Sequence, residues 1–247
     1  WNNYVYATRL MKNILLTGGG GGIARAIAAL LAAEPYRLLL TTRAADALRS
    51  FCEKNEIQAE VFSADLTQQA DVEALFAWAE TFGGVDVLIN NAGISHAAAS
   101  WKLTADELHR LMEVNFYSAV RCTQLALQGM REKGYGRVIS VSSVVAHKPA
   151  FGTSAYAASK SALEGYMRGV ALDVSTKGIT ANTIAYGYMD AGMLNDVPQP
   201  ILDDIRNGIP QDQFGRPEQI VAAIRYLIES EYTTGQTLHI NGGQWMP

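Results

Sequence analysis

Five consecutive glycines, Gly18 to Gly22, constrain this chain more than any other feature. They follow the apolar segment ILLT and precede IARAIAALLA, whose apolar residues recur with helical spacing. Glycines here let the backbone turn sharply and approach a ligand, while the helix N-terminus offers unpaired N–H groups and a partial positive charge. The run therefore predicts a turn that binds a pyrophosphate. A flexible linker is the alternative, but a linker belongs between domains and not directly after the first strand of a sheet.

The rest of the chain alternates short apolar segments with amphipathic ones such as VEALFAWAETF and IVAAIRYLIES. Continuous apolar strands alternating with helices are typical of a parallel sheet that is covered on both faces. We therefore predict an α/β fold, a single doubly wound Rossmann-type domain with a parallel seven-stranded sheet and helices on both faces. The expected strands are Asn13–Thr17, Arg37–Thr41, Ala59–Phe62, Val85–Asn90, Arg137–Ser142, Ile179–Ile184 and Gln236–Ile240.

Composition excludes several classes of protein. The 20 basic and 24 acidic residues give a net charge of −4, which argues against a nucleic-acid binder. No apolar segment is long enough to cross a membrane and no secretory signal is visible. Cys52 and Cys122 belong to no disulfide or metal-ligand pattern, so we expect no metal and a reducing cytoplasm.

Two segments stand outside this pattern. Met11 begins MKNILLTG, so we expect the domain to span residues 11–247 and residues 1–10 to be an added or upstream extension. The stretch from Tyr186 to Phe214 is the least regular and holds Pro198, Pro200 and Pro210. It is predicted to be a mobile flap over a site or a plain surface loop.

The glycine run has the spacing Thr17-Gly18-x-x-x-Gly22-Ile23-Ala24. It resembles the TGxxxGIG turn of the short-chain dehydrogenase/reductase family, with Ala24 in place of the last glycine. Because that small residue allows close packing of helix on strand, one added methyl affects packing more than binding.

The second strand ends at Thr42 and Arg43, where enzymes of this topology choose their cofactor. A carboxylate there accepts from the ribose 2′-OH of NAD, whereas a cation binds the 2′-phosphate of NADP. Thr42 stands in the place of the acid, and the Arg43 guanidinium can pair with two phosphate oxygens. The resemblance therefore implies NADPH, although Arg43 could merely end a strand. Many relatives add a second basic residue in the turn, where this chain has Gly21.

Two further motifs agree with the resemblance. Asp65-Leu66 matches the acidic residue near the adenine ring, and Asn90-Asn91-Ala92-Gly93 matches the NNAG motif, which steadies the sheet and lines the cofactor. Alone, the latter could be an ordinary turn. The implied cofactor site comprises Thr17, Gly18, Gly20, Gly21, Gly22, Ile23, Thr42, Arg43, Asp65, Leu66, Asn91, Ala92, Gly93, Tyr156, Lys160, Tyr186, Gly187 and Met189.

Tyr156 and Lys160 form a YxxxK pair, which places both side chains on one helical face. Ser143 lies thirteen residues upstream, at the end of a strand, and Asn115 occupies the position of the family's fourth catalytic residue. Singly, each could be a helix-surface or capping residue. A free tyrosine has a pKa near 10 and holds its proton too tightly at neutral pH, and a nearby ammonium lowers that pKa.

The resemblance implies a role for each of these residues in reducing a ketone. Tyr156 is the general acid, Ser143 binds the substrate oxygen, and Lys160 stabilises the phenolate and holds the nicotinamide ribose. Asn115 keeps a proton relay to Lys160 open. The four histidines show no metal-ligand spacing, and His147 is a minor candidate for substrate contact.

Within the family, the chain is most similar to the 3-oxoacyl-[acyl-carrier-protein] reductases. Its TGQTLHINGG segment resembles their C-terminal TGQTLHVNGG, and Gly215-Arg216-Pro217-Glu218 resembles the turn before their last long helix. The resemblance implies a homotetramer or homodimer and a 3-oxoacyl substrate on acyl carrier protein. An acidic carrier needs basic residues beside the pocket, and the candidates are Lys177, Arg131 and Lys133. A solvated face explains these charges equally well.

The chain departs most from the family after its sixth strand. Tyr186 replaces a proline, and Ala191 replaces the threonine that contacts the cofactor. The expected consequence is weaker cofactor binding or a reshaped acyl pocket. Two alternatives therefore stay open: a dehydrogenase for a sugar, steroid or polyol, and a cofactor-binding partner subunit with weak turnover.

Overall fold

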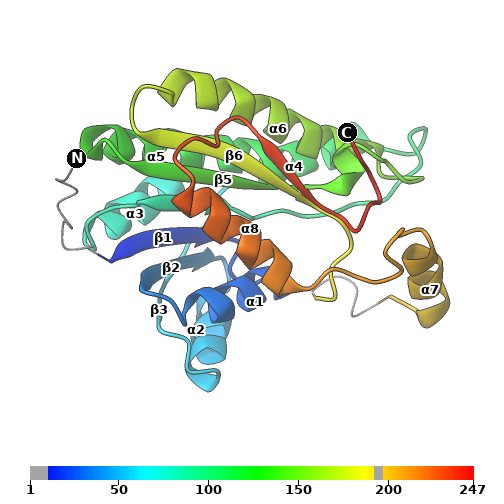
Figure 1. Cartoon of the computed structure of the whole chain (residues 1–247), viewed down its shortest axis with the longest axis horizontal. Coiled ribbons are helices and arrows are strands. Elements are labelled where there is room, and N and C mark those ends of the chain that lie inside the picture. The colour runs from blue at the N-terminus through cyan, green and yellow to red at the C-terminus, as the bar shows by residue number, and fades with distance from the viewer. Residues whose placement is uncertain (1–10, 192–196) are drawn as a thin grey trace, which may run out of the picture.

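Seven parallel strands form one sheet in the order β3-β2-β1-β4-β5-β6-β7 (Figure 1). A computed structural model of the chain describes residues 11–191 and 197–247, so the predicted extension 1–10 lies outside the described residues. The strands are β1 Lys12–Thr17, β2 Tyr36–Thr42, β3 Ala59–Ser63, β4 Val87–Asn90, β5 Gly136–Ser143, β6 Ile179–Tyr186 and β7 Thr237–Ile240. Every predicted strand is present, with ends that shift by one or two residues.

Helices cover both faces of the sheet, as predicted (Figure 1). Alternate strand residues point to opposite faces, so Leu16 packs with the helices on one side and Leu15 with those on the other. The first layer contains α1 Gly22–Leu31, α2 Ala45–Lys54 and α8 Pro217–Glu229. The second contains α3 Gln69–Glu80, α5 Ser118–Lys133 and α6 Ser154–Val174. The doubly wound prediction is therefore confirmed.

Four shorter elements complete the described fold. They are α4 Ala105–Met112, the π-helix η1 Glu113–Tyr117, the 3-10 helix η2 Val144–Ala146, and α7 Gln199–Asn207. None of the helices in the described ranges combines the length and apolar character needed to span a membrane.

The irregular stretch predicted from Tyr186 to Phe214 contains a helix that the sequence interpretation missed. Pro198 is the N-cap residue of α7, and Pro200 lies in its first turn. Proline is favoured there because the first N–H groups of a helix have no intrahelical partner. Prolines taken as signs of a loop thus mark the start of a helix. Residues 192–196 of that stretch lie outside the described residues.

Strand order reverses at β1, because the chain winds outward through β2 and β3 and then returns to pair β4 with the other side of β1. At such a switch point the carboxyl ends of the two central strands leave a crevice, which is where sheets of this kind bind ligands. The glycine run follows β1, and the NNAG segment follows β4. The topology therefore brings the two motifs to one crevice.

Candidate active site

The glycine turn meets the segment after β4 at close range. Gly18 has a φ of +69°, and a Cβ added to it would lie 2.7 Å from the Cα of Ala92. Gly21 is the N-cap of α1 in extended conformation, and no side chain caps the helix there. The N-terminal N–H groups of α1 therefore face the crevice without a side-chain cap, as a phosphate-binding turn requires.

Thr17 holds the two motifs together. Its Oγ1 accepts hydrogen bonds from the backbone N–H groups of Asn91 and Ala92, each at 3.0 Å, and the Asn91 Nδ2 donates to the Thr17 carbonyl, also at 3.0 Å. Next to it, the buried Asn90 Nδ2 donates to Thr123 at 3.0 Å and to Ser140 at 3.3 Å. These bonds fix the end of β4 against β1, α5 and β5.

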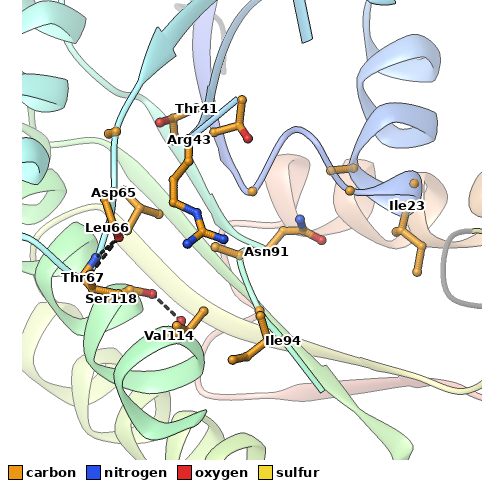
Figure 2. A pocket seen from close by; sticks show the side chains of 18 of the residues that line it. Ile23, Thr41, Arg43, Asp65, Leu66, Thr67, Asn91, Ile94, Val114 and Ser118 are labelled. Carbon is orange, nitrogen blue, oxygen red and sulfur yellow. Dashed lines mark hydrogen bonds between the residues drawn. The ribbon is translucent and has the colours of Figure 1, made fainter. Parts of the chain in front are cut away.

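A cavity of about 630 Å³ occupies the crevice (Figure 2). Most of the residues predicted to bind a cofactor line it, namely Gly18, Gly21, Gly22, Ile23, Thr42, Arg43, Asp65, Leu66, Asn91, Ala92, Gly93 and Tyr186. Thr17, Gly20, Gly187 and Met189 do not belong to its wall, and neither do Tyr156 and Lys160. Met189 is buried and pairs with Gly215 in an isolated bridge, so its side chain serves the core.

Eight lining residues lie outside the predicted cofactor set, and three of them belong to helical segments in which no cofactor contact was predicted. Arg110, Val114 and Ser118 recur at intervals of four along α4, η1 and the start of α5, and all three line the cavity. A spacing of four places side chains on one helical face. That spacing was visible in the sequence, but nothing there indicated that the face meets the crevice.

Arg43 supplies a positive charge at the end of the cavity that lies beside the segments following β2 and β3. Figure 2 shows its side chain extending into the cavity, and among the described residues no carboxylate forms an ion pair with it. The pKa of Asp65 is lowered, first by hydrogen bonds from Thr67 and also by the charge of Arg43. A cation and an ionised carboxylate therefore lie near each other at this end.

The predicted catalytic residues come from three elements that meet near the carboxyl end of the sheet. Tyr156 and Lys160 lie in the first turns of α6, and Ser143 ends β5. Asn115 lies in η1, the π-helix between α4 and α5. Such single-turn π segments occur often at functional sites. Periodicity predicts only a continuous helix here, so the widened turn is a feature that sequence reasoning missed.

Lys160 is buried and its Nζ donates to the carbonyl oxygen of Val141 at 2.8 Å. The same Nζ lies 5.8 Å from the centre of the Tyr156 ring. Burial lowers the pKa of Lys160 from 10.5 to about 8, and the charge of Glu164 opposes that fall. Lys160 therefore loses its proton much more readily than a free lysine.

The expectation that Lys160 lowers the pKa of Tyr156 is not met in this structure. Burial raises the pKa of the Tyr156 hydroxyl, and a hydrogen bond with Ser143 opposes the rise. The reason is that the Lys160 ammonium is bonded to strand β5 and not to the phenol. Burial therefore favours the protonated form of Tyr156.

Asn115, the fourth predicted catalytic residue, is hydrogen-bonded to the backbone of Ile94. Its Oδ1 accepts from the Ile94 N–H at 2.8 Å, while its Nδ2 donates to the Ile94 carbonyl at 2.9 Å and to Ser159 at 3.0 Å. A Cβ added to Gly93 would lie 3.3 Å from Asn115 Oδ1 and 3.4 Å from Lys160 Nζ. Gly93 is thus the point where the cavity wall reaches two of the four predicted catalytic residues.

The three residues that depart from the family pattern lie in different parts of the fold. Ala24 is buried against the sheet, and Ala191 follows β6 with its N–H bonded to the Met189 carbonyl. Tyr186 lines the cavity, and burial raises its pKa, with Tyr156 as a neighbour that adds to the rise. The tyrosine that replaces the family's proline therefore lines the cavity and neighbours Tyr156, the predicted catalytic tyrosine.

The basic residues considered for carrier docking lie at the other edge of the sheet. Lys177 precedes β6, while Arg131 and Lys133 end α5 just before β5, so all three are at the amino ends of the strands. The 21 residues of α6 separate this edge from Tyr156, a span of about 30 Å. Lys133 also pairs with Asp86 at 2.8 Å. The expectation that these cations lie beside the pocket of the same chain is wrong.

Comparisons with known proteins agree with this geometry. The family model described as short chain dehydrogenase matches residues 12–201. The 3-oxoacyl-[acyl-carrier-protein] reductase FabG of Vibrio cholerae is 33% identical over 242 residues, which cover 95% of this chain and 98% of that protein. Acetoacetyl-CoA reductase of Allochromatium vinosum is 32% identical over 240 residues (94% and 98%), and carbonyl reductase family member 4 of Xenopus laevis is 30% identical over 236 residues (95% and 98%).

Proposed function

The chain belongs to the short-chain dehydrogenase family, and from that premise we propose that it is an NADPH-dependent ketoreductase that converts a 3-oxoacyl thioester to the 3-hydroxyacyl thioester. Family membership makes it an oxidoreductase that acts between CH–OH and ketone groups with a nicotinamide cofactor. The proposal adds the phosphorylated cofactor, the class of substrate and the roles of the site residues.

One observation carries the proposal: half-buried Tyr156 has Ser143 beside its hydroxyl and Lys160 Nζ 5.8 Å from its ring centre, next to Gly93 in the cavity wall. In the proposed reaction the Tyr156 hydroxyl donates its proton to the oxygen of the reduced ketone, while the Ser143 hydroxyl binds that oxygen. Ser143 lies close enough to the Tyr156 hydroxyl to lower its pKa, so both hydroxyls can face one substrate oxygen. The Lys160 ammonium stabilises the phenolate left behind, and Asn115 holds the Ile94 backbone beside it.

The cavity fits a dinucleotide of this class. Its volume of about 630 Å³ lies in the usual range for ligand sites. The uncapped N-terminus of α1 would hold the pyrophosphate, Asp65 and Leu66 would lie against the adenine, and Lys160 would hold the nicotinamide ribose. Arg43 would pair with the 2′-phosphate, since it is charged and forms no ion pair among the described residues. When bound, the nicotinamide supplies the hydride.

The substrate class rests on what the relatives share. The names of two of them specify a 3-oxoacyl group on a carrier protein and an acetoacetyl group on coenzyme A. Both are 3-oxo thioesters, so we assign the thioester to this chain and prefer the carrier-bound form. The proposal includes a homotetramer or homodimer. It also includes a cytoplasmic location, which two free, buried cysteines support.

A substrate panel tests the proposal. Purified protein is given NADPH or NADH with acetoacetyl-CoA, an acetoacetyl carrier protein, a keto sugar and a steroid ketone, and it is given NADP+ or NAD+ with a polyol. We expect oxidation of NADPH with the two thioesters and little with the rest. Turnover of a sugar, steroid or polyol alone would contradict the substrate class. Tight NADPH binding without turnover of any compound would favour the alternative of a cofactor-binding partner subunit.

A further inference from the structure

A buried carboxylate lies directly behind the predicted catalytic residues. Glu164, on α6, is 3% exposed. Its Oε1 accepts a hydrogen bond from Ser142 Oγ at 2.6 Å, and its Oε2 lies 3.0 Å from His147 Nε2. Neither the family motifs nor the proposed mechanism uses this group.

The hydrogen bonds favour the ionised form of Glu164. The bond from Ser142 is as short as those in which a hydroxyl donates to a charged carboxylate. Both carboxylate oxygens lie within 3.1 Å of the same imidazole nitrogen, so an Nε2–H donor satisfies the pair without a proton on the carboxylate. A buried carboxylate persists as an anion when it is paired in this way.

The charge of Glu164 acts on Lys160. The two residues are four positions apart on α6, so their side chains share one face of the helix. Burial favours loss of the Lys160 proton, and Glu164 is the neighbour whose charge favours keeping it. Removing that charge leaves burial unopposed.

We propose that Glu164 is a positioning residue for the reductase chemistry: held by Ser142 and His147, its carboxylate keeps Lys160 in the ammonium form. The inference rests on the proposed function, because the ammonium matters for stabilising the Tyr156 phenolate. The inference gives a role to Ser142 on β5, Glu164 on α6 and His147 after η2, none of which is among the four predicted catalytic residues.

The other titratable groups around this pair are few in the described part of the chain. These groups are Tyr156 on α6, Tyr186 at the end of β6, Tyr188 just beyond that strand, and His239 on β7. Burial lowers the pKa of His239, and His147 adds to the fall. None of these groups is a carboxylate.

The C-terminal segment fixes His147 from the other side. The Trp245 ring stacks on the His147 ring with centres 4.3 Å apart and planes at 25°. Trp245 also packs with Tyr156 in a small cluster around Val144 and Ala157, and Figure 1 shows the C-terminus beside the start of α6. The imidazole is therefore held by the Trp245 ring on one side while its Nε2 faces Glu164.

The test is the Glu164→Gln variant, which keeps the shape of the side chain and removes its charge. Reduction of acetoacetyl-CoA is measured from pH 6 to 10, and NADPH binding is measured by fluorescence over the same range without substrate. We expect the alkaline loss of kcat and of NADPH affinity to begin about half a pH unit or more lower than in the wild type, since both follow the Lys160 charge. Ser142→Ala keeps the Glu164 carboxylate, so it should shift the alkaline loss of kcat and of NADPH affinity less than Glu164→Gln does.

Glu73→Gln is the matched control, because Glu73 is exposed on α3 and bonds only to Gln69 in its own helix. It should leave both pH limbs unchanged. A Glu164→Gln variant that is folded and keeps the wild-type limbs would overturn the inference, even if its kcat were lower at every pH. If no thioester is turned over by the wild type, the proposed function fails, and the binding curves still decide the role of Glu164.

Discussion

The ammonium of Lys160 is bonded to the carbonyl oxygen of Val141 at 2.8 Å, and the residue is only 3% exposed. One hydrogen bond to a backbone carbonyl does not replace the hydration that a charged lysine loses on burial. The chain keeps a destabilising charge at this point, and the proposed chemistry is the reason for it.

This arrangement predicts that Lys160→Met stabilises the fold while it abolishes turnover. Because the pKa of Lys160 is about 8 in the folded protein and near 10.5 when unfolded, the folded state binds the proton more weakly. Burial of the Lys160 charge therefore lowers the free energy of unfolding by on the order of 3 kcal/mol below about pH 8. This loss of stability disappears as the pH rises toward 10.5. Thermal unfolding should show a higher Tm for the variant at pH 7 and a difference that narrows at pH 9 to 10. A variant less stable than the wild type at pH 7 would contradict this account.

A second prediction concerns the turn, where two glycines differ in what they tolerate. Gly18 has a positive φ and no room for a Cβ, whereas a Cβ on Gly21 would meet nothing closer than the Gly18 oxygen at 3.5 Å. Gly18→Ala should lose about 2 kcal/mol or more in urea unfolding, from strain and from displacement of Ala92. Gly21→Ala, the matched control, should change stability by less than about 1 kcal/mol. Equal losses in the two variants would show that the turn is not constrained as described.

A third prediction concerns the choice of cofactor. Arg43→Ala should raise the KM for NADPH about tenfold or more with little change in kcat, because a charged hydrogen-bond partner of the 2′-phosphate is lost. The KM for NADH should change by less than about twofold. Arg49→Ala is the control, since Arg49 is exposed on the neighbouring α2 and pairs with Asp46. An unchanged KM for NADPH would remove the basis for NADPH preference.

Much of the fold was predictable because burial imposes a simple pattern on parallel strands. Segments such as ILLT and VDVLIN are apolar on both faces, and each is bounded by polar or glycine residues. The same signal could not predict α7, where prolines at the helix start resemble those of a loop. Nor could it predict the π-helix at Asn115, since one extra residue in a turn leaves the apolar spacing nearly unchanged.

The site residues that lie in contiguous sequence motifs were predictable. Those that the fold brings together from distant segments were not. Thr17, Arg43 and Tyr156 stand in short contiguous segments, and the order of these segments along the chain made them recognisable. The Ser142, Glu164 and His147 group is formed by β5, α6 and the segment after η2, and Trp245 joins it from the end of the chain. No local spacing connects those positions, so only the packing of elements around the carboxyl end of β5 reveals the group.

The central claim is that Tyr156 delivers the proton to the reduced ketone, and one comparison tests it directly. Initial rates of NADPH oxidation with acetoacetyl-CoA are measured at pH 7 for the wild type and for Tyr156→Phe, with NADPH affinity measured in parallel. We predict that kcat falls by about a hundredfold or more in the variant while NADPH still binds, as expected for loss of a general acid. A Tyr156→Phe enzyme that keeps the wild-type rate would contradict the account.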